Sequence, residues 1–302
     1  MRSRTLGDGG PEVSVVGLGT NNFGPRIDYE QSRSVVDAAL DAGVTLFDTA
    51  DIYGQGTSEE HIGRALEGRR DSVLIATKFG KPMHERPEER RGSRDYIRWA
   101  VESSLRRLRT DVIDVYQMHE PDEGTPIEET LGALHELVAE GKVRYIGSSN
   151  YSAEQIERAD RIAGERNLTR FVAAQNEYSL LERDAEDELL PACERLGIGV
   201  LPFFPLASGL LTGKYRRGEQ APEGRLAGRE IPAERWDRVE RLQRYADERN
   251  VSLLAVAIGG LAAMPAIASV IAGATKPEQV RANVEAGAWE PSAEDLEALK
   301  AL

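Results

Sequence analysis

Four side chains that can hold or donate a proton stand where apolar, β-branched runs of the sequence end. They are Asp48 after VTLF, Tyr53 one turn later, Lys78 after SVLIAT and His119 after VIDVYQM. Taken singly, each has an ordinary structural role: a helix cap (for Asp48 or the nearby Asp51), a packed aromatic, a solvated charge or a loop histidine. Because all four recur at the ends of runs, we interpret them together as one functional site.

The chemistry that these residue types favour is proton donation to an oxygen that gains negative charge. A free tyrosine titrates at about 10, which is too high for ready donation at neutral pH. An ammonium such as Lys78 stabilises the phenolate and lowers the pKa of Tyr53, and Asp48 can keep that ammonium protonated and aimed. His119 can orient a substrate carbonyl oxygen, so that Tyr53 acts as general acid. Because no side chain delivers a hydride to the carbonyl carbon, the group implies a nicotinamide cofactor.

The elements that must position these residues alternate between two apolar patterns. Short β-branched runs recur roughly every 30 residues, and apolar residues at helical spacing lie between them. This alternation predicts an α/β fold, a (β/α)8 TIM barrel whose site lies at the C-terminal ends of the strands. A doubly wound open sheet is the alternative, because one sequence does not give strand order. The eight expected strands are 13–19, 44–50, 72–78, 112–119, 143–150, 171–177, 197–205 and 268–275.

Helix boundaries are indicated by capping residues and glycines. Expected helices span 32–43, 58–68, 96–109 and 127–142. Residues suited to helix starts and helix ends stand at several boundaries. The expected starts are Ser58, Ser152 and Thr125–Pro126, and the expected ends are Gly43, Gly68 and Gly141.

Two connections are long, polar and rich in Gly and Pro. One spans about 80–94, after the third expected strand, and the other about 207–234, after the seventh. Loops of this length inside a compact domain are usually lids or binding loops. Both leave strand ends on the face where barrel sites form, so we expect them to shape the substrate pocket.

Composition limits the class of protein. The net charge of −13 argues against nucleic-acid binding, which needs a basic face, and against adsorption to anionic membranes. The single cysteine, Cys193, cannot form an internal disulfide, and neither a signal peptide nor an apolar run long enough to span a bilayer is visible. We therefore expect a cytoplasmic protein with one domain over residues 1–302.

Seven motifs in order give the chain a close resemblance to the aldo-keto reductase superfamily, in particular its bacterial branch with a long loop after strand seven. They are FDTADIYG, IATKFG, YQMHEPD, IGSSNY, AAQNEYSLL, PFFPLASGLLTGKY and VIAGATKPEQVRANV. The resemblance covers essentially the whole length. It implies the barrel fold, NADPH-dependent reduction of a small carbonyl substrate, and a catalytic tetrad at Asp48, Tyr53, Lys78 and His119.

The same resemblance implies positions for the cofactor. The carboxamide of the nicotinamide would be held by Ser149, Asn150 and Gln175, and Asn150 could cap the helix that follows, instead of or in addition to this role. Phe203 stands where many members have a tyrosine under the ring, so the hydroxyl of that tyrosine is absent here. Further implied cofactor positions are Gly19, Thr20, Asn21 and Asp48 at the cleft, Leu206, Ala207, Gly209, Leu211 and Lys214 over the pyrophosphate, and Gly273, Thr275, Lys276, Gln279 and Asn283 near the adenosine.

Within the last motif, one residue bears on the choice of cofactor. Lys276 fits the basic residue that members place against the 2′-phosphate, which favours NADPH over NADH. Gln279 stands where some members carry an arginine. The glycine-rich run VVGLGTNNFG does not match a dinucleotide fingerprint, because the helix after it starts too late for glycines in its first turn.

Other functions remain open at this point. Lys78 could instead be the nucleophile of a Schiff-base aldolase, which needs a depressed pKa at Lys78, whereas Asp48 raises it. The barrel could also be a non-catalytic, nucleotide-binding regulatory or redox-sensing subunit, as some superfamily members are. The remaining histidines and the cysteine lack metal-ligand spacing, so no metal is expected. The family is often monomeric, and we expect a monomer.

Overall fold

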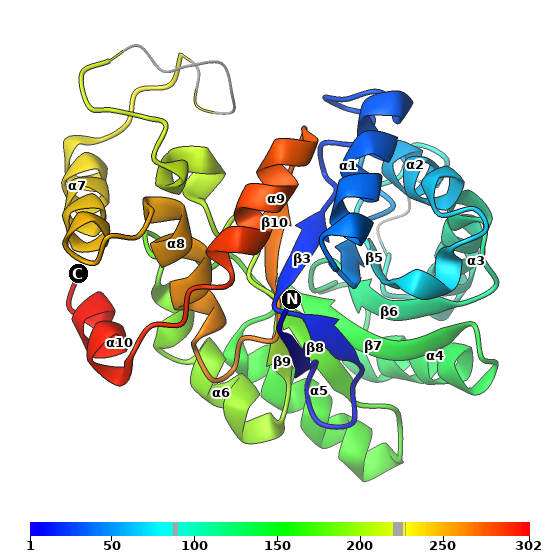
Figure 1. The fold of residues 1–302 in the computed structure, drawn as a ribbon. Helices are drawn as coiled ribbons and strands as arrows, with labels where there is room; N and C mark the ends of the chain where they lie inside the picture. Colours follow the sequence, from blue (N-terminus) through cyan, green and yellow to red (C-terminus); the bar gives the residue numbers. More distant parts are fainter. Residues whose placement is uncertain (87–89, 220–225, 227) are drawn as a thin grey trace.

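The computed structural model describes residues 1–86, 90–219, 226 and 228–302, and its centre is a barrel of eight parallel strands (Figure 1). Each strand pairs with its neighbours in the order β10-β3-β4-β5-β6-β7-β8-β9. The strands are β3 (Val16–Gly19), β4 (Leu46–Asp48), β5 (Leu74–Phe79), β6 (Ile113–Met118), β7 (Val143–Ser149), β8 (Phe171–Gln175), β9 (Gly199–Val200) and β10 (Val270–Gly273).

Backbone hydrogen bonds close the sheet between its two end strands. The Ala268 amide donates to the Val200 carbonyl and the Ile271 amide to the Pro202 carbonyl, each at 3.0 Å. The prediction of a (β/α)8 barrel is therefore confirmed, and the open doubly wound sheet is excluded. In a closed barrel the C-terminal ends of all eight strands surround one mouth.

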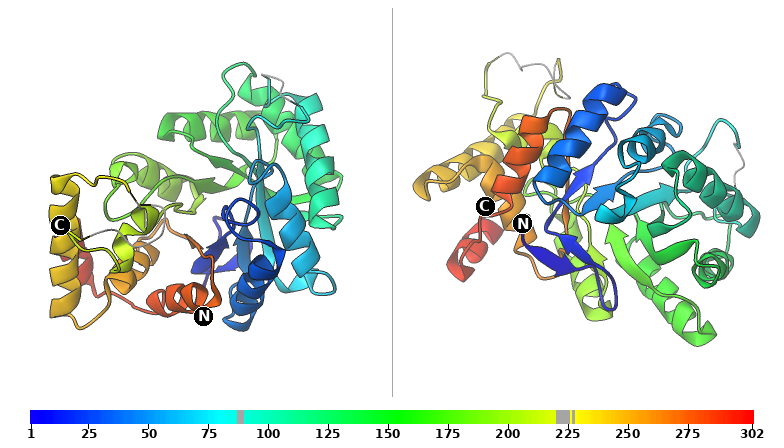
Figure 2. Two further views of the ribbon diagram at one scale, coloured as in Figure 1. Left: turned by 90° about the horizontal axis from the view of Figure 1, so that it is seen from above. Right: turned by 45° about the vertical axis from the view of Figure 1, so that its right-hand side comes forward.

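Helices surround the barrel on its outer side (Figures 1 and 2). Helices α7 and α10 lie side by side near the C-terminus, where the Tyr245 hydroxyl donates to Asp295 Oδ1 at 3.1 Å. No helix in the described ranges is both long and apolar enough to cross a bilayer. The helices are α1 (Tyr29–Asp41), α2 (Thr57–Ala65), α3 (Arg94–Leu108), α4 (Ile127–Ala139), α5 (Ala153–Arg166), α6 (Leu189–Leu196), α7 (Ala233–Glu248), α8 (Leu253–Ala262), α9 (Pro277–Ala286) and α10 (Ala293–Lys300).

The first expected strand, 13–19, is divided in the structure, so that prediction was wrong in extent. Its start forms β2 (Glu12–Ser14), which pairs antiparallel with β1 (Ser3–Thr5) in a hairpin. Leu6 and Val13 from this hairpin pack with inward-facing barrel residues, including Val115. The hairpin lies against the residues that begin β8 and β9, so it closes the N-terminal face of the barrel and leaves the other face open.

Helix starts agree with the sequence at two positions and disagree at one. Ser152 caps α5 in a capping box with Gln155, and α4 begins directly after Pro126. Ser58 is not a cap, because α2 begins at Thr57 after Gly56. The Ser58 hydroxyl lies inside the protein and is 2.9 Å from the Thr49 hydroxyl, so it joins the end of β4 to α2. Gly43 and Gly141 adopt left-handed φ angles directly after helices α1 and α4, as expected.

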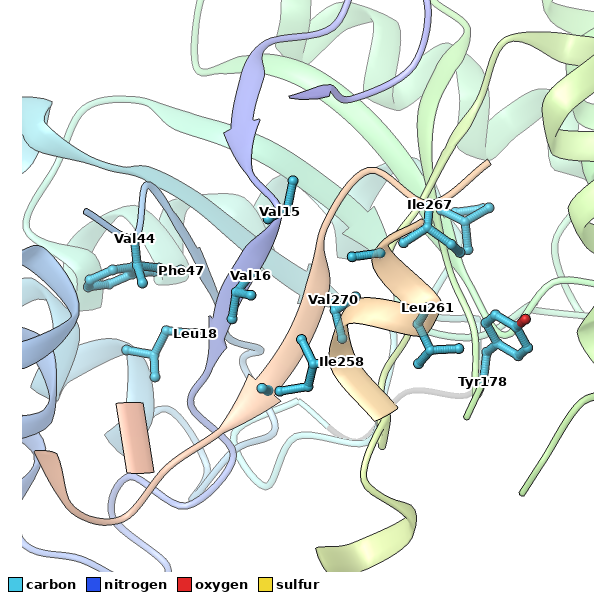
Figure 3. Packing of buried hydrophobic residues seen from close by; sticks show 14 of the residues in the cluster. Val15, Val16, Leu18, Val44, Phe47, Tyr178, Ile258, Leu261, Ile267 and Val270 are labelled. Carbon is cyan, nitrogen blue, oxygen red and sulfur yellow. The ribbon is translucent and has the colours of Figure 1, made fainter. Parts of the chain in front are cut away.

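Two layers of apolar residues hold the barrel together. One layer fills the interior and includes Leu46, Ala76 and Val115. The other lies between the strands and the helices, and Figure 3 shows the part in which Val270 of β10 lies beside Ile258 and Leu261 of α8. Because side chains alternate along a strand, successive residues of β5 face these two layers in turn. Lys78 therefore faces inward and Thr77 outward.

The two long connections are described in part. In the first connection, 80–94, residues 87–89 lie outside the described residues. In the second, 207–234, residues 220–225 and 227 lie outside them. The second connection opens with a short 3-10 segment, η3 (Ala207–Thr212), directly above the end of β9.

Candidate active site

Asp48 and Lys78 form a buried ion pair at the mouth of the barrel. Lys78 Nζ donates to Asp48 Oδ1 at 2.9 Å, to Asp48 Oδ2 at 2.8 Å and to the Thr49 carbonyl at 2.7 Å. Lys78 has no exposed surface. Burial by itself would lower the pKa of Lys78, but the Asp48 charge, with Tyr53, outweighs it and raises that pKa. The ammonium therefore stays protonated at neutral pH and is held in place at the mouth.

Tyr53 lies beside this ammonium on a tight turn between β4 and α2. Lys78 Nζ is 5.3 Å from the centroid of the Tyr53 ring, and a hydrogen bond to Tyr53 contributes to the raised pKa of Lys78. The turn needs glycine at its end, since Gly56 has φ +97° and a Cβ there would lie 2.5 Å from Arg107 Cδ. Tyr53 is half-buried, so it can meet both the ammonium and a molecule in the mouth.

His119 comes from β6 and faces Tyr53. Its amide donates to the Phe79 carbonyl at 2.8 Å, which continues the β5–β6 ladder by one residue. The two rings meet edge to face with centroids 6.0 Å apart. Burial, followed by the charges of Lys78 and Lys81, lowers the pKa of His119 to about 2. The imidazole is therefore neutral at working pH, and its Nδ1 has no hydrogen-bond partner among the described residues.

The amide residues at the ends of β7 and β8 join the same mouth. Gln175 Nε2 donates to Asp48 Oδ1 at 2.8 Å, and the Asn150 amide donates to the Gln175 carbonyl at 2.9 Å. Asn150 Nδ2 donates to the His119 carbonyl at 2.9 Å and to Ser149 Oγ at 3.1 Å. Asn150 is thus not a helix cap, because Ser152 has that role and the side chain of Asn150 is directed to the mouth instead.

The ends of β3 and β10 form a part of the rim with small side chains. Gly19 pairs with Gly273, and a Cβ on Gly273 would lie 3.5 Å from Asn22 Nδ2. The next residue, Thr20, is fully buried and donates its hydroxyl proton to the Asp48 carbonyl at 2.9 Å. The Thr20 side chain therefore fixes β3 to β4. Gly19 is closely packed, because a Cβ there would lie 3.1 Å from Ile271 Cγ2, whereas Gly273 is exposed at the rim.

The segment after β9 carries an unusual backbone. Phe204, Ala207 and Ser208 have φ angles of 52°, 46° and 60°, a region that L-residues other than Asn and Asp seldom adopt. Such conformations cluster at functional sites and persist because surrounding structure holds them. Here the Ala207 amide donates to the Phe204 carbonyl at 2.8 Å and the Gly209 amide to the Leu206 carbonyl at 2.8 Å.

The expected cofactor residues of this segment differ in accessibility. Phe203 is half-buried, and its amide is held by the Asn176 carbonyl at 3.0 Å. Leu206 and Gly209 are also half-buried, while Lys214 is exposed. Leu211 is fully buried in the apolar layer between the strands and the helices, so its side chain anchors the loop after β9 to the core.

The start of α9 places the last expected group. Lys276 is the N-cap residue and is exposed, with Pro277 as the first helical residue. Gln279 Oε1 accepts the Thr275 amide at 2.7 Å and the Thr275 hydroxyl at 3.2 Å. Asn283, one turn further along, is nearly buried. Gln279 thus has a structural role of its own, which its position in the motif did not indicate.

A second charged group, on the outer side of the barrel wall, did not emerge from the sequence. Glu59 Oε1 accepts a hydrogen bond from the Thr77 hydroxyl at 2.6 Å, and Glu59 Oε2 accepts one from Arg107 Nε at 2.7 Å. Asp51, which sequence reasoning treated only as a possible helix cap, lies against this pair. Residues 48 positions apart give no signal at sequence level, so the Glu59–Arg107 pair could not be anticipated.

Gln117 is a further polar residue that sequence reasoning missed. It lies two residues before His119 in β6, pairs directly with Lys78 and Gly147 of the neighbouring strands, and has no exposed surface. Neither atom of its side-chain amide has a hydrogen-bond partner within the described part of the chain. A polar residue inside an apolar strand, in phase with His119, was the signal that could have found it.

A closed barrel that gathers an ion pair, a half-buried tyrosine and a neutral imidazole at its C-terminal mouth has the architecture of an α/β-barrel oxidoreductase. Comparison with known proteins makes this specific. The sequence profile of the Aldo/keto reductase family matches residues 15–302. The chain belongs to the aldo/keto reductase family.

Relatives and a solved structure are similar over nearly the full length. An uncharacterized oxidoreductase YrpG of Bacillus subtilis is 40% identical over 95% of this chain and 91% of its own length. A probable voltage-gated potassium channel subunit beta of Arabidopsis thaliana is 36% identical over the same shares of the two chains. The holo form of aldo-keto reductase AKR11C1 from Bacillus halodurans aligns with a TM-score of 0.84 at 33% identity, covering 100% of this chain and 96% of that one.

Proposed function

We propose that the protein reduces aldehydes or ketones to alcohols with NADPH, and that Tyr53 donates the proton. The observation that carries this proposal is the Lys78 ammonium, fully buried, held by both oxygens of Asp48 and hydrogen-bonded to Tyr53. A cation fixed beside a phenol stabilises the phenolate, and so makes the phenol a better acid. Family membership makes an oxidoreductase the expected class.

The residues at the rim fit a nicotinamide dinucleotide. The side-chain NH2 group of Gln175 donates to Asp48, and its side-chain oxygen can accept a hydrogen bond from the cofactor. Ser149 and Asn150 lie at the end of the neighbouring strand as neutral polar groups. Gly273 is exposed at the rim and carries no side chain that would cover the mouth. At the start of α9, the exposed Lys276 is suited to a phosphate, which favours NADPH over NADH.

The proposed reaction assigns one task to each residue of the tetrad. When bound, NADPH supplies the hydride for the carbonyl carbon. Tyr53 gives its hydroxyl proton to the carbonyl oxygen as that oxygen gains negative charge, and Lys78 stabilises the phenolate that results. Asp48 holds Lys78 protonated and in place. The neutral His119 orients the carbonyl oxygen, and Tyr53 regains its proton from solvent at the half-open mouth.

The test is a deuterium-transfer measurement on the purified protein. NADPH deuterated at the nicotinamide C4 is mixed with a panel of small aldehydes and ketones, and the alcohols are examined by mass spectrometry. We expect deuterium on the carbinol carbon of at least one product, with a faster rate for NADPH than for NADH. Tight NADPH binding without transfer to any member of the panel would contradict the reductase proposal.

That contrary result would favour a second candidate, a nucleotide-binding regulatory or redox-sensing subunit. The names of two relatives, both probable voltage-gated potassium channel subunits beta, make this the specific alternative. The geometry speaks against a Schiff-base aldolase. Lys78 Nζ is surrounded by three acceptor atoms and its pKa is raised, whereas a nucleophilic amine must lose its proton.

A further inference from the structure

Asp51 is a buried carboxyl group two residues before Tyr53. Its side chain has about 1% of its surface exposed, and neither carboxyl oxygen has a hydrogen-bond partner among the residues that the structure describes. The Ile52 amide is near enough to lower the pKa of Asp51, but it does not reach hydrogen-bond geometry with either oxygen. An ionised carboxylate in such a place would lack the hydrogen bonds that a buried charge requires.

The surroundings of Asp51 hold one cation for two carboxyl groups. Glu59 of α2 already receives the hydrogen bonds of Thr77 and Arg107, so Glu59 is the ionised member. Arg107 of α3 then balances one negative charge. If Asp51 were also ionised, the buried group would carry a net charge of minus one in a site of low dielectric. A proton on Asp51 makes the group neutral.

The other titratable groups nearby do not supply the missing charge. Tyr116 of β6 is fully buried, and its hydroxyl has no hydrogen-bond partner among the described residues. Burial, followed by the charge of Asp51, raises the pKa of Tyr116 well above its usual value. Lys78 faces the barrel interior, where its ammonium is paired with Asp48 and also donates to the Thr49 carbonyl. Burial, together with the negative charge of Glu59, likewise raises the pKa of Asp51 well above its usual value.

Asp51 is also part of the turn that carries Tyr53. The Asp51 amide donates to the Lys78 carbonyl at 3.0 Å, and the Tyr53 amide donates to the Ala50 carbonyl at 3.1 Å. The Asp51 side chain is buried at this turn and interacts with Glu59, Arg107 and Tyr116. A negative charge on the buried Asp51 side chain would need water for solvation, and this water would displace the turn that carries Tyr53.

We propose that Asp51 is a positioning residue that is held as a neutral carboxylic acid at neutral pH and supports the Tyr53 turn in that form. The role in positioning rests on the proposed reductase function, whereas the protonation of Asp51 does not. Asparagine has the shape of the protonated acid and cannot ionise. Asp51→Asn should therefore substitute for the native residue, while Asp51→Ala should not.

The first experiment measures the proton directly. Infrared difference spectra of wild type against Asp51→Asn at pH 7 should show the carbonyl band of a protonated carboxylic acid, lost in the variant. Asp111→Asn is the matched control, because Asp111 is exposed, and its difference spectrum should show a carboxylate band instead. A carboxylate band for Asp51 would overturn the proposal, whether or not a reductase substrate has been found.

The second experiment measures positioning through turnover of a reducible aldehyde. We expect Asp51→Asn to keep at least a third of the wild-type kcat, and Asp51→Ala to lose tenfold or more with less change in KM. Equal losses in both variants would show that an ionised carboxylate is needed and would overturn the proposal. If wild type reduces no carbonyl compound, the reductase assignment fails and the infrared result alone decides the state of Asp51.

Discussion

Each face of strand β5 contacts one group of buried charged residues, and the two groups differ in how their charges are compensated. On the inner face, Lys78 pairs with Asp48. On the outer face, Thr77 contacts Glu59, which pairs with Arg107 beside Asp51. The groups are therefore attached to adjacent residues of one strand, and both lie under the turn that carries Tyr53.

The difference between them lies in how charges and hydrogen bonds are matched. The inner group has one cation and one anion, and both oxygens of Asp48 accept hydrogen bonds from Lys78. The outer group has two carboxyl groups and one cation, and Asp51 has no hydrogen-bond partner in the described parts of the chain. A matched pair can keep its charges at neutral pH and act on a neighbour, whereas an unmatched acid must take up a proton.

The largest effect should come from breaking the inner pair. Lys78→Met removes the cation from the buried Asp48, which must then stay charged without compensation or take up a proton at a free-energy cost, so we expect the free energy of unfolding to fall by about 3–5 kcal/mol. Urea denaturation at pH 7 measures this. In the double variant Lys78→Met/Asp48→Asn the charge is gone, and much of the stability should return. A double variant as unstable as the single one would contradict the pairing account.

A smaller loss should follow from removing the cation of the outer group. Arg107→Met deprives Glu59 of a charged hydrogen bond, which is worth about 1.5–3 kcal/mol. The same denaturation experiment applies, with Arg107→Met/Glu59→Gln as the rescue. Each variant leaves one buried carboxylate without its cation, and the outer loss should be the smaller one because Arg107 is partly exposed whereas Lys78 is not. A loss larger than that of Lys78→Met would contradict a neutral Asp51, because two ionised carboxyl groups would then lie without a cation.

The pH dependence of stability tests the surroundings of His119, because burial, followed by the charges of Lys78 and Lys81, lowers the pKa of His119. An unfolded histidine has a pKa of about 6.5, whereas the folded value is about 2. Below pH 6.5 the unfolded chain takes up a proton that the folded protein does not, so stability falls as pH falls. The linkage relation gives about 2 kcal/mol at pH 5.

The measurement compares wild type with His119→Gln at pH 7.5 and pH 5. Wild type should lose about 2 kcal/mol more than the variant over this interval, since glutamine does not titrate. Parallel losses in the two proteins would mean that His119 can be protonated in place, which would contradict the neutral imidazole of the proposed site.

The smallest effect should come from breaking an ion pair on the exposed surface. Arg94 contacts Glu136 at 2.9 Å, but about half of the arginine side chain is exposed. Arg94→Ala should change the free energy of unfolding by at most about 1 kcal/mol, and the change should shrink in high salt. A loss comparable with that of Lys78→Met would remove the distinction between buried and exposed pairs on which the comparison depends.

A structural feature could be predicted from the sequence when it repeats along the chain or has a local sequence signal. The alternating strand and helix patterns predicted the barrel, and the hydrogen bonds that close the sheet confirm it. The placement of Asp48, Lys78 and His119 at one mouth follows from parallel strands, which bring their ends to one face. Ser152 was identifiable as a cap because capping chemistry is local.

What the sequence did not yield depends on contacts between distant residues. Ser58 looks like a helix cap, yet its hydroxyl bonds to Thr20 and Thr49 on two neighbouring strands. Leu211 lies in a motif expected at the cofactor, yet its side chain is in the core. Asp51 has no local feature that separates it from Asp48, and its burial becomes visible only when α2 and α3 are in place.

The central claim is that Tyr53 is an acid made effective by Lys78, and Tyr53→Phe tests it most directly because it removes one oxygen and keeps the ring. The measurement is NADPH oxidation with a reducible aldehyde, together with NADPH affinity from fluorescence titration of the same preparations. We predict that kcat falls by about 10²–10⁴-fold in Tyr53→Phe while the Kd for NADPH stays within a factor of three. Equal kcat values in wild type and Tyr53→Phe would contradict the assignment of Tyr53 as the proton donor.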